Sequence, residues 1–127
     1  MSLISTINSI SSEDNIINLN KGDILFNSGD KGSSIYAILK GIILLTWKTI
    51  ANEQKHEEII QGNVFGTGAL ITKDHSRFSS AKAIKQTELI ELNRDKFLFA
   101  VQEVPMFALE LLASLDERIQ EISLRNI

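Results

Sequence analysis

The fold is decided by residues 64–81, Val64-Phe65-Gly66-Thr67-Gly68-Ala69-Leu70-Ile71-Thr72-Lys73-Asp74-His75-Ser76-Arg77-Phe78-Ser79-Ser80-Ala81. Gly66 and Gly68 allow the main chain to pass close to a ligand, because a glycine carries no Cβ. The apolar residues that follow are expected to form a short helical turn whose free N–H groups suit a phosphate. Arg77 returns across a loop and offers a guanidinium fork to the same anion. The alternative for Arg77 is a surface arginine paired with Asp74 or Glu88.

On both sides of this stretch, short β-rich segments alternate with turn residues. Such spacing is typical of an antiparallel sandwich or barrel. The expected strands are Ile16–Leu19, Ile24–Phe26, Ile35–Leu39, Ile42–Trp47, Glu57–Ile60 and Glu88–Leu92.

After Leu92 the apolar period changes to that of helices. Asn93 is expected to cap a short first helix. Pro105, the single proline of the chain, suits the first turn of a second helix. That helix carries an apolar seam with heptad-like spacing, made of Ala108, Leu112, Leu115, Ile119, Ile122 and Asn126. Strands followed by helices predict a mainly β fold with C-terminal helices.

Composition excludes several classes of protein. The 127 residues suffice for one domain, and 43% of them are hydrophobic. A formal net charge of -3 argues against direct nucleic-acid binding. The chain has no cysteine, no secretory signal and no apolar run near the roughly 20 residues of a membrane span. We therefore expect a soluble, cytoplasmic protein that does not contact membranes.

Residues 64–81 resemble the phosphate-binding cassette of the cyclic-nucleotide-binding domain family, the type found in catabolite activator proteins and kinase regulatory subunits. In that family a Phe-Gly-Glu-x-Ala-Leu run precedes an arginine that pairs with the cyclic phosphate. Phe65-Gly66, Ala69-Leu70 and Arg77 match this pattern. The glycine framework from Gly22 to Gly41 also resembles the barrel of the family. The resemblance implies a double-stranded β-helix (jelly-roll) barrel.

The residue pattern and the resemblance together suggest a division of the chain and a set of ligand-binding residues. Residues 1–15 would be an N-terminal segment, helical or partly disordered, 16–92 the barrel, and 93–127 the hinge and lid helices. The implied ligand is cyclic AMP or cyclic GMP, with no other cofactor and no metal. The residues expected at the ligand are Phe65, Gly66, Thr67, Gly68, Ala69, Leu70, Arg77, Phe78 and Ser79.

Two of these positions depart from the family pattern. Thr67 replaces the acidic residue that accepts a hydrogen bond from the ribose 2′-hydroxyl. Its neutral hydroxyl is expected to weaken affinity about tenfold. Phe78 replaces a small residue, and it either points into the barrel or intrudes where the phosphate sits.

Three functions follow from these patterns. The first is a regulatory sensor that binds a cyclic nucleotide and signals through its C-terminal helix. The second is a barrel that has lost nucleotide binding and acts as a homodimer or docks an effector protein through residues 105–124. The third, a metal-dependent cupin enzyme, requires histidine ligands that Ser33–Ala37 lack. We therefore expect a module that is not an enzyme and stands alone, without a helix-turn-helix domain.

Overall fold

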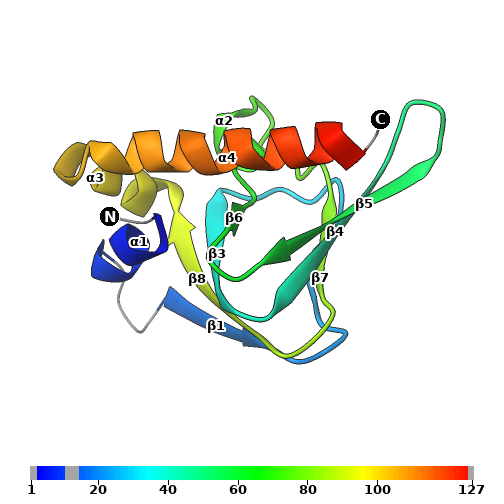
Figure 1. Cartoon of the computed structure of the whole chain (residues 1–127), viewed down its shortest axis with the longest axis horizontal. Coiled ribbons are helices and arrows are strands. Elements are labelled where there is room, and N and C mark those ends of the chain that lie inside the picture. The colour runs from blue at the N-terminus through cyan, green and yellow to red at the C-terminus, as the bar shows by residue number, and fades with distance from the viewer. Residues whose placement is uncertain (1–2, 11–14, 126–127) are drawn as a thin grey trace.

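Two four-stranded antiparallel sheets form the body of the protein, whose computed structural model describes residues 3–10 and 15–125 (Figure 1). One sheet has the strand order β1-β8-β3-β6, comprising Ile16–Leu19, Thr87–Asn93, Ser34–Lys40 and Val64–Phe65. The other has the order β2-β7-β4-β5, comprising Ile24–Phe26, Ser80–Ala83, Ile42–Lys48 and Gln54–Ile60. The architecture is jelly-roll-like, and the expected mainly β fold class with C-terminal helices is confirmed.

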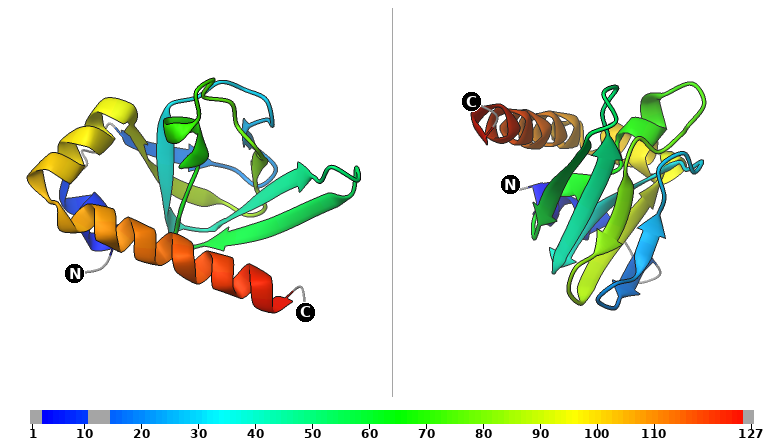
Figure 2. Two further views of the ribbon diagram at one scale, coloured as in Figure 1. Left: turned by 90° about the horizontal axis from the view of Figure 1, so that it is seen from above. Right: turned by 90° about the vertical axis from the view of Figure 1, so that its right-hand side faces the viewer.

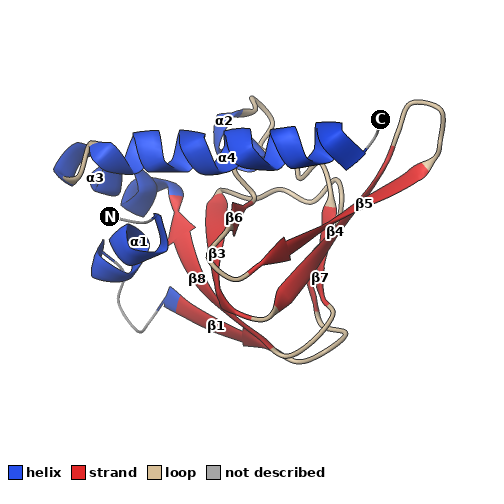
Figure 3. Cartoon of the chain, viewed as in Figure 1, coloured by secondary structure: helices blue, strands red, loops and turns tan. Residues whose placement is uncertain are grey.

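Four helices complete the described part of the chain: α1 Leu3–Ile10, α2 Gly68–Ile71, α3 Arg94–Glu103 and α4 Met106–Arg125 (Figure 3). The long helix α4 runs along one side of the sheets, from the end that holds α1 and α3 toward the β4–β5 hairpin (Figures 1 and 2). Within the described residues no single helix is long and apolar enough to cross a membrane. The pair α3 and α4, bent by 115°, passes that test by length and composition only.

Strand β3 is buried on both of its faces. Ile35 and Ala37 pack with the helices, whereas Tyr36 and Ile38 face the space between the two sheets. Successive side chains of a strand point to opposite faces, so a strand between two cores needs apolar residues at every position. This explains the uninterrupted apolar run from Ile35 to Leu39.

The strand segments differ from the sequence prediction at three places. Strand β5 begins at Gln54, and the strands β6 and β7 were not predicted. Most of β5 faces solvent, so its first residues are polar and carry no hydrophobic signal. Strand β6 has two residues, and the inward positions of β7 are the small residues Ala81 and Ala83.

The apolar seam predicted along α4 does not form one continuous packed face. Phe107 and Leu111 are the residues that α4 buries in the core, each one position before a predicted seam residue. Leu115 and Ile122 line a cavity beside the sheets. Leu112 and Ile119 are each 62% exposed, so the seam is divided between the cavity and solvent. Asn126 lies outside the described residues, as do residues 1–2 and 11–14 of the predicted N-terminal segment.

Candidate functional site

Residues 64–81, the cassette, begin with a strand in the sheet and end where β7 starts. Phe65 of β6 lies opposite Tyr36 of β3, which fixes the start of the cassette against the first sheet. The main chain then turns at Gly66, whose φ is 88°, and enters α2. The loop after α2 returns Arg77 to the body of the protein. The Arg77 N–H donates to the Asp30 carbonyl at 2.8 Å, and its carbonyl accepts from the Gly29 N–H at 2.8 Å.

The Arg77 side chain is buried, with 5% of the residue exposed. Its Nη1 donates to the Gly66 carbonyl at 3.0 Å, and its Nη2 donates to the Ser34 carbonyl at 2.9 Å. The guanidinium carbon lies 4.3 Å from the centre of the Phe26 ring, a favourable cation–π distance. Arg77 is therefore an interior residue, not the surface arginine of the alternative interpretation.

No carboxylate within the described residues forms an ion pair with Arg77. Asp74, one of the two partners considered, lies near Lys31 instead. Burial lowers the pKa of Arg77, and the charges of Tyr36 and Glu91 oppose that shift. Arginine keeps its proton in proteins, so the site holds a buried positive charge, with two carbonyl dipoles and an aromatic face in contact and the Glu91 carboxylate nearby. Such a site attracts an anion.

Two glycines shape the space that the guanidinium occupies. A Cβ at Gly32 would lie 2.6 Å from Arg77 Nε, and one at Gly66 would lie 2.8 Å from Nη1. Neither distance is compatible with a side chain, so the guanidinium could not take this position beside any other residue. Sequence reasoning assigned Gly32 only to a turn, and it missed this contact because Arg77 is distant along the chain.

A cavity of about 330 Å³ lies between the cassette, the second sheet and α4. This volume falls within the range of small-molecule sites, roughly 300–1,000 Å³. Its polar wall includes Thr67, Arg77 and Ser79, while Leu115 and Ile122 come from α4. The cassette, the sheet and the long helix therefore all contribute to one site.

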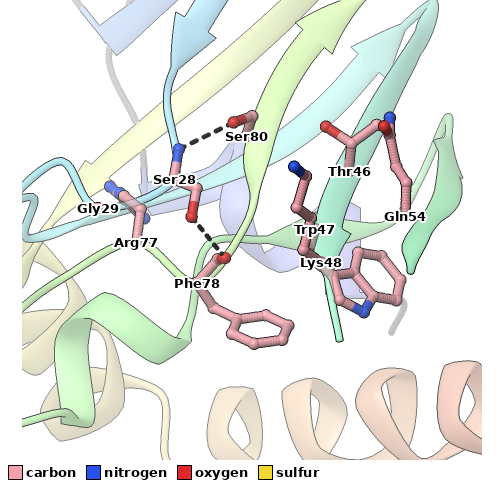
Figure 4. Close-up of a pocket in the computed structure, with 9 residues that line it drawn as sticks. All are labelled: Ser28, Gly29, Thr46, Trp47, Lys48, Gln54, Arg77, Phe78 and Ser80. Carbon is pink, nitrogen blue, oxygen red and sulfur yellow. Dashed lines mark hydrogen bonds between the residues drawn. The ribbon is translucent and has the colours of Figure 1, made fainter. Parts of the chain in front are cut away.

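Phe78 points away from the barrel and is 72% exposed. Its ring lies 6.0 Å from that of Trp47, centre to centre, and Figure 4 shows the two beside each other. A second, open cavity of about 570 Å³ shares Trp47, Arg77 and Phe78 with the first. It is also lined by Ser28, Gly29, Thr46, Lys48, Gln54 and Ser80 (Figure 4). The ring therefore does not point into the barrel, the first of the two orientations considered for Phe78, and it contributes to the lining of both cavities.

Seven of the nine residues proposed from the sequence line the smaller cavity: Gly66, Thr67, Gly68, Ala69, Arg77, Phe78 and Ser79. The other two, Phe65 and Leu70, are buried and pack the cassette against the core. Phe65 stacks on Tyr36 at 5.4 Å between ring centres, and Leu70 packs in the core beneath the helices.

Seven further residues line this cavity and were not proposed as ligand-binding from the sequence: Phe26, Leu45, Trp47, Glu57, Leu115, Arg118 and Ile122. Trp47 and Leu115 were interpreted as packing or seam residues. Glu57 stands in a charged run, and only its inward position on β5 distinguishes it from its neighbours. The signal that could have found it is the alternation of β5, where position 57 falls on the same face as the apolar Ile59.

Several known proteins are similar to this chain in sequence and in fold. The family model described as "Cyclic nucleotide-binding domain" matches residues 16–103. The cyclic AMP receptor protein of Thermus thermophilus is 29% identical over 105 residues, which cover 82% of this chain and 48% of that protein. The cAMP-dependent protein kinase regulatory subunit of Dictyostelium discoideum is 27% identical over 85 residues, 64% of this chain and 26% of that one.

Among solved structures, the catabolite activator protein of Thermus thermophilus superposes with a TM-score of 0.77 at 25% identity. The superposition covers 97% of this chain and 56% of that one. The chain thus spans about half the length of its Thermus relatives and about a quarter of the kinase subunit.

Proposed function

Because the chain belongs to the cyclic nucleotide-binding domain family, we propose that its cavity of about 330 Å³ binds cyclic AMP or cyclic GMP. The observation that carries this proposal is the buried guanidinium of Arg77, which lines the cavity and has no carboxylate partner among the described residues. A cyclic phosphate would supply the missing negative charge. The protein would act as a regulatory module and not as an enzyme.

The phosphate end of the ligand would lie against the cassette. Arg77 would pair with the phosphate, and the main chain from Gly66 to Ala69 would form the wall beside it. A hydrogen bond between charged groups contributes about 1.5–3 kcal/mol, so this contact would dominate the affinity. Thr67 would meet the ribose with a neutral hydroxyl, which costs about a factor of ten in affinity compared with a carboxylate.

Ligand binding would be signalled by a change in the position of α4. Leu115, Arg118 and Ile122 of this helix line the cavity, so a ligand there contacts α4 directly. A ligand that binds one position of α4 more tightly than another shifts the population toward that position. The change in helix position would then be the output that a partner detects.

Isothermal titration calorimetry with cyclic AMP and with cyclic GMP tests this proposal. The Arg77→Met variant should bind at least about tenfold more weakly, because it loses a charge-assisted hydrogen bond. Thr67→Glu should bind about tenfold more tightly for the same reason. Lys82→Met removes a positive charge from an exposed position of β7 outside both cavities, and its affinity should not change. No heat from either nucleotide at millimolar concentration would overturn the proposal.

A second candidate function rests on the exposed side of α4. Leu109, Leu112 and Ile119 are 58–62% exposed on this helix. We propose, as the alternative, that this face forms a homodimer or docks an effector protein whether or not a nucleotide binds. Sedimentation should then show a dimer that Ile119→Asp dissociates and that Gln120→Asp does not. A monomer at every concentration would exclude the homodimer.

A further inference from the structure

An ion pair between β5 and α4 forms part of the cavity wall. Arg118 Nε donates to Glu57 Oε2 and Nη2 donates to Oε1, both at 3.1 Å. The two side chains are 17% and 11% exposed, respectively, whereas the members of the other ion pairs in residues 3–10 and 15–125 are at least half exposed. Among the residues that the structure describes, Glu57 is the single carboxylate lining the cavity, alongside Arg77 and Arg118.

The register of the second sheet places Glu57 away from the phosphate end. Leu45 of β4 stands opposite Ala81 of β7 on one side and opposite Glu57 of β5 on the other. Strands lie about 4.8 Å apart, so Glu57 is roughly 10 Å across the sheet from β7, the strand that follows Arg77. A nucleotide whose phosphate meets Arg77 can therefore direct the far edge of its base toward Glu57.

The carboxylate of Glu57 retains acceptor capacity in this position. An ionised carboxylate offers about four lone-pair sites and no donor. Arg118 uses two of these sites, and the third hydrogen bond of Arg118 goes to the Val64 carbonyl. The ion pair thus holds the carboxylate in place beside the cavity and leaves it free to accept further hydrogen bonds.

Guanine and adenine differ at the edge that an acceptor would meet. Guanine presents two adjacent donors, N1–H and the 2-amino group. Adenine presents one donor, the 6-amino group, beside an acceptor at N1 whose lone pair a carboxylate repels. A site built to hydrogen-bond one group discriminates against an analogue that leaves the site's polar atoms unpaired.

We propose that Glu57, positioned by Arg118, makes this site selective for guanine, so that cyclic GMP binds in preference to cyclic AMP. The inference rests on the proposed function. Trp47 and Phe78 line the same cavity and offer aromatic faces on which the base can stack, a contact that does not distinguish the two purines. The selectivity therefore comes from Glu57.

Calorimetric titration of the unaltered chain with three cyclic nucleotides tests this without any substitution. Cyclic IMP keeps the N1–H of cyclic GMP but lacks the 2-amino group. We expect affinity to fall in the order cyclic GMP, cyclic IMP, cyclic AMP, with at least about a tenfold difference between the first and the last. Equal affinities, or tighter binding of cyclic AMP, would overturn the inference.

Two matched variants then locate the effect. Glu57→Gln should lower the ratio of cyclic GMP to cyclic AMP affinity about tenfold, because the amide is neutral and also carries donors. Glu58→Gln removes the same charge from the neighbouring, exposed position of β5 and should leave the ratio unchanged. A ratio unaltered in Glu57→Gln would also overturn the inference.

The two proposals fail in different ways. If none of the three nucleotides binds, the proposed function is wrong and the selectivity with it. If the nucleotides bind through Arg77 without a preference among bases, only the role of Glu57 is wrong. Thermal unfolding of each variant shows whether it is folded, and the nucleotide series on the unaltered chain needs no variant.

Discussion

Arg77 keeps its buried position because its neighbours lack side chains at two points. Gly66 and Gly32 face the guanidinium directly. Gly66 also adopts a φ of 88°, in the left-handed region that glycine enters without strain. Gly62 has nearly the same backbone angle, 90°, but a Cβ there would meet nothing within 4 Å.

Gly62 and Gly66 provide a matched comparison, because both have a positive φ but only Gly66 faces Arg77. Gly62→Ala should destabilise the protein by about 1–2 kcal/mol, the cost of a left-handed residue. Gly66→Ala should destabilise it by more, because its Cβ would also meet Arg77 Nη1. Only Gly66→Ala should also weaken nucleotide binding, because its Cβ would displace Arg77. Urea unfolding and calorimetry measure the two effects separately, and equal nucleotide affinities in the two variants would contradict the expectation.

Tyr36 lies beneath the cassette and is the single tyrosine of the chain. Burial raises its pKa above the ordinary value of 10.0, and the nearby Glu91 carboxylate raises it further. The hydroxyl lies 3.4 Å from Glu91 Oε2, to which it donates.

A raised folded-state pKa means that the neutral tyrosine stabilises the fold. Its contribution is complete below the unfolded pKa of 10.0 and is lost as the pH rises through the higher folded value. The tyrosinate absorbance of the folded protein should therefore show a midpoint above 10.0. Tyr36→Phe should remove the loss of stability that accompanies ionisation of Tyr36 at alkaline pH. A midpoint at or below the ordinary value would refute the assignment.

Sequence reasoning brought together residues whose position depends on close neighbours in the chain. The cassette residues from Gly66 to Ala69 and Arg77 were proposed together and line one cavity. Glu57 and Arg118 were not proposed, because 61 residues separate them and only the packing of α4 on β5 brings them together. The outward orientation of Phe78, with its ring beside Trp47, was not predicted from the sequence either.

At the scale of elements, the cassette is tied to the C-terminal helices through its own short helix. Arg94, the first residue of α3, donates from Nη1 to the Leu70 carbonyl of α2 at 3.0 Å. The His75 ring lies with Nδ1 2.8 Å from the Ala69 carbonyl, which accepts a hydrogen bond from it. A displacement of α2 would thus be transmitted to the start of α3 through the hydrogen bond of Arg94.

The start of α3 depends on its cap. The Asn93 side chain accepts a hydrogen bond from the Lys96 N–H at 2.9 Å, as the sequence predicted. Asn93→Ala should lower the free energy of unfolding by about 1 kcal/mol, the usual value of a lost N-cap. Gln102→Ala, at an exposed position of the same helix, should have little effect. Chemical denaturation measures both, and similar losses in the two variants would argue against the cap.

The elements that sequence reasoning located are those with strong apolar patterns. Strands β3, β4 and β8 and the C-terminal helices carry such patterns over several residues. Strands β6 and β7 lack them because β6 is very short and β7 points alanines inward. Their pairing is decided by β3 and by β4, so no local signal could have defined them.

At the scale of the whole molecule, α4 is attached to the rest of the protein at two distant points. Phe107 and Leu111 anchor its first half in the core with α1 and α3. Arg118 joins its second half to Glu57 of β5 and to the Val64 carbonyl. The helix lies over the cavity from Leu115 to Ile122, a stretch that includes the second attachment point.

The second attachment can be tested through stability. Arg118→Met leaves the Glu57 carboxylate buried without its partner and should destabilise the protein by about 3 kcal/mol. The double variant Glu57→Leu with Arg118→Met should recover most of that loss, because two apolar residues can replace a buried ion pair. Denaturant unfolding measures both, and a double variant as unstable as the single one would contradict this account.

Trp47 is the single tryptophan of the chain, and it lines both cavities beside Phe78. The tryptophan fluorescence of the protein therefore comes from one indole that lines the proposed nucleotide site. A purine that stacks there would quench this emission, and a change in the water around the ring would shift its maximum. The molecule thus carries its own optical reporter of occupancy, with no label attached.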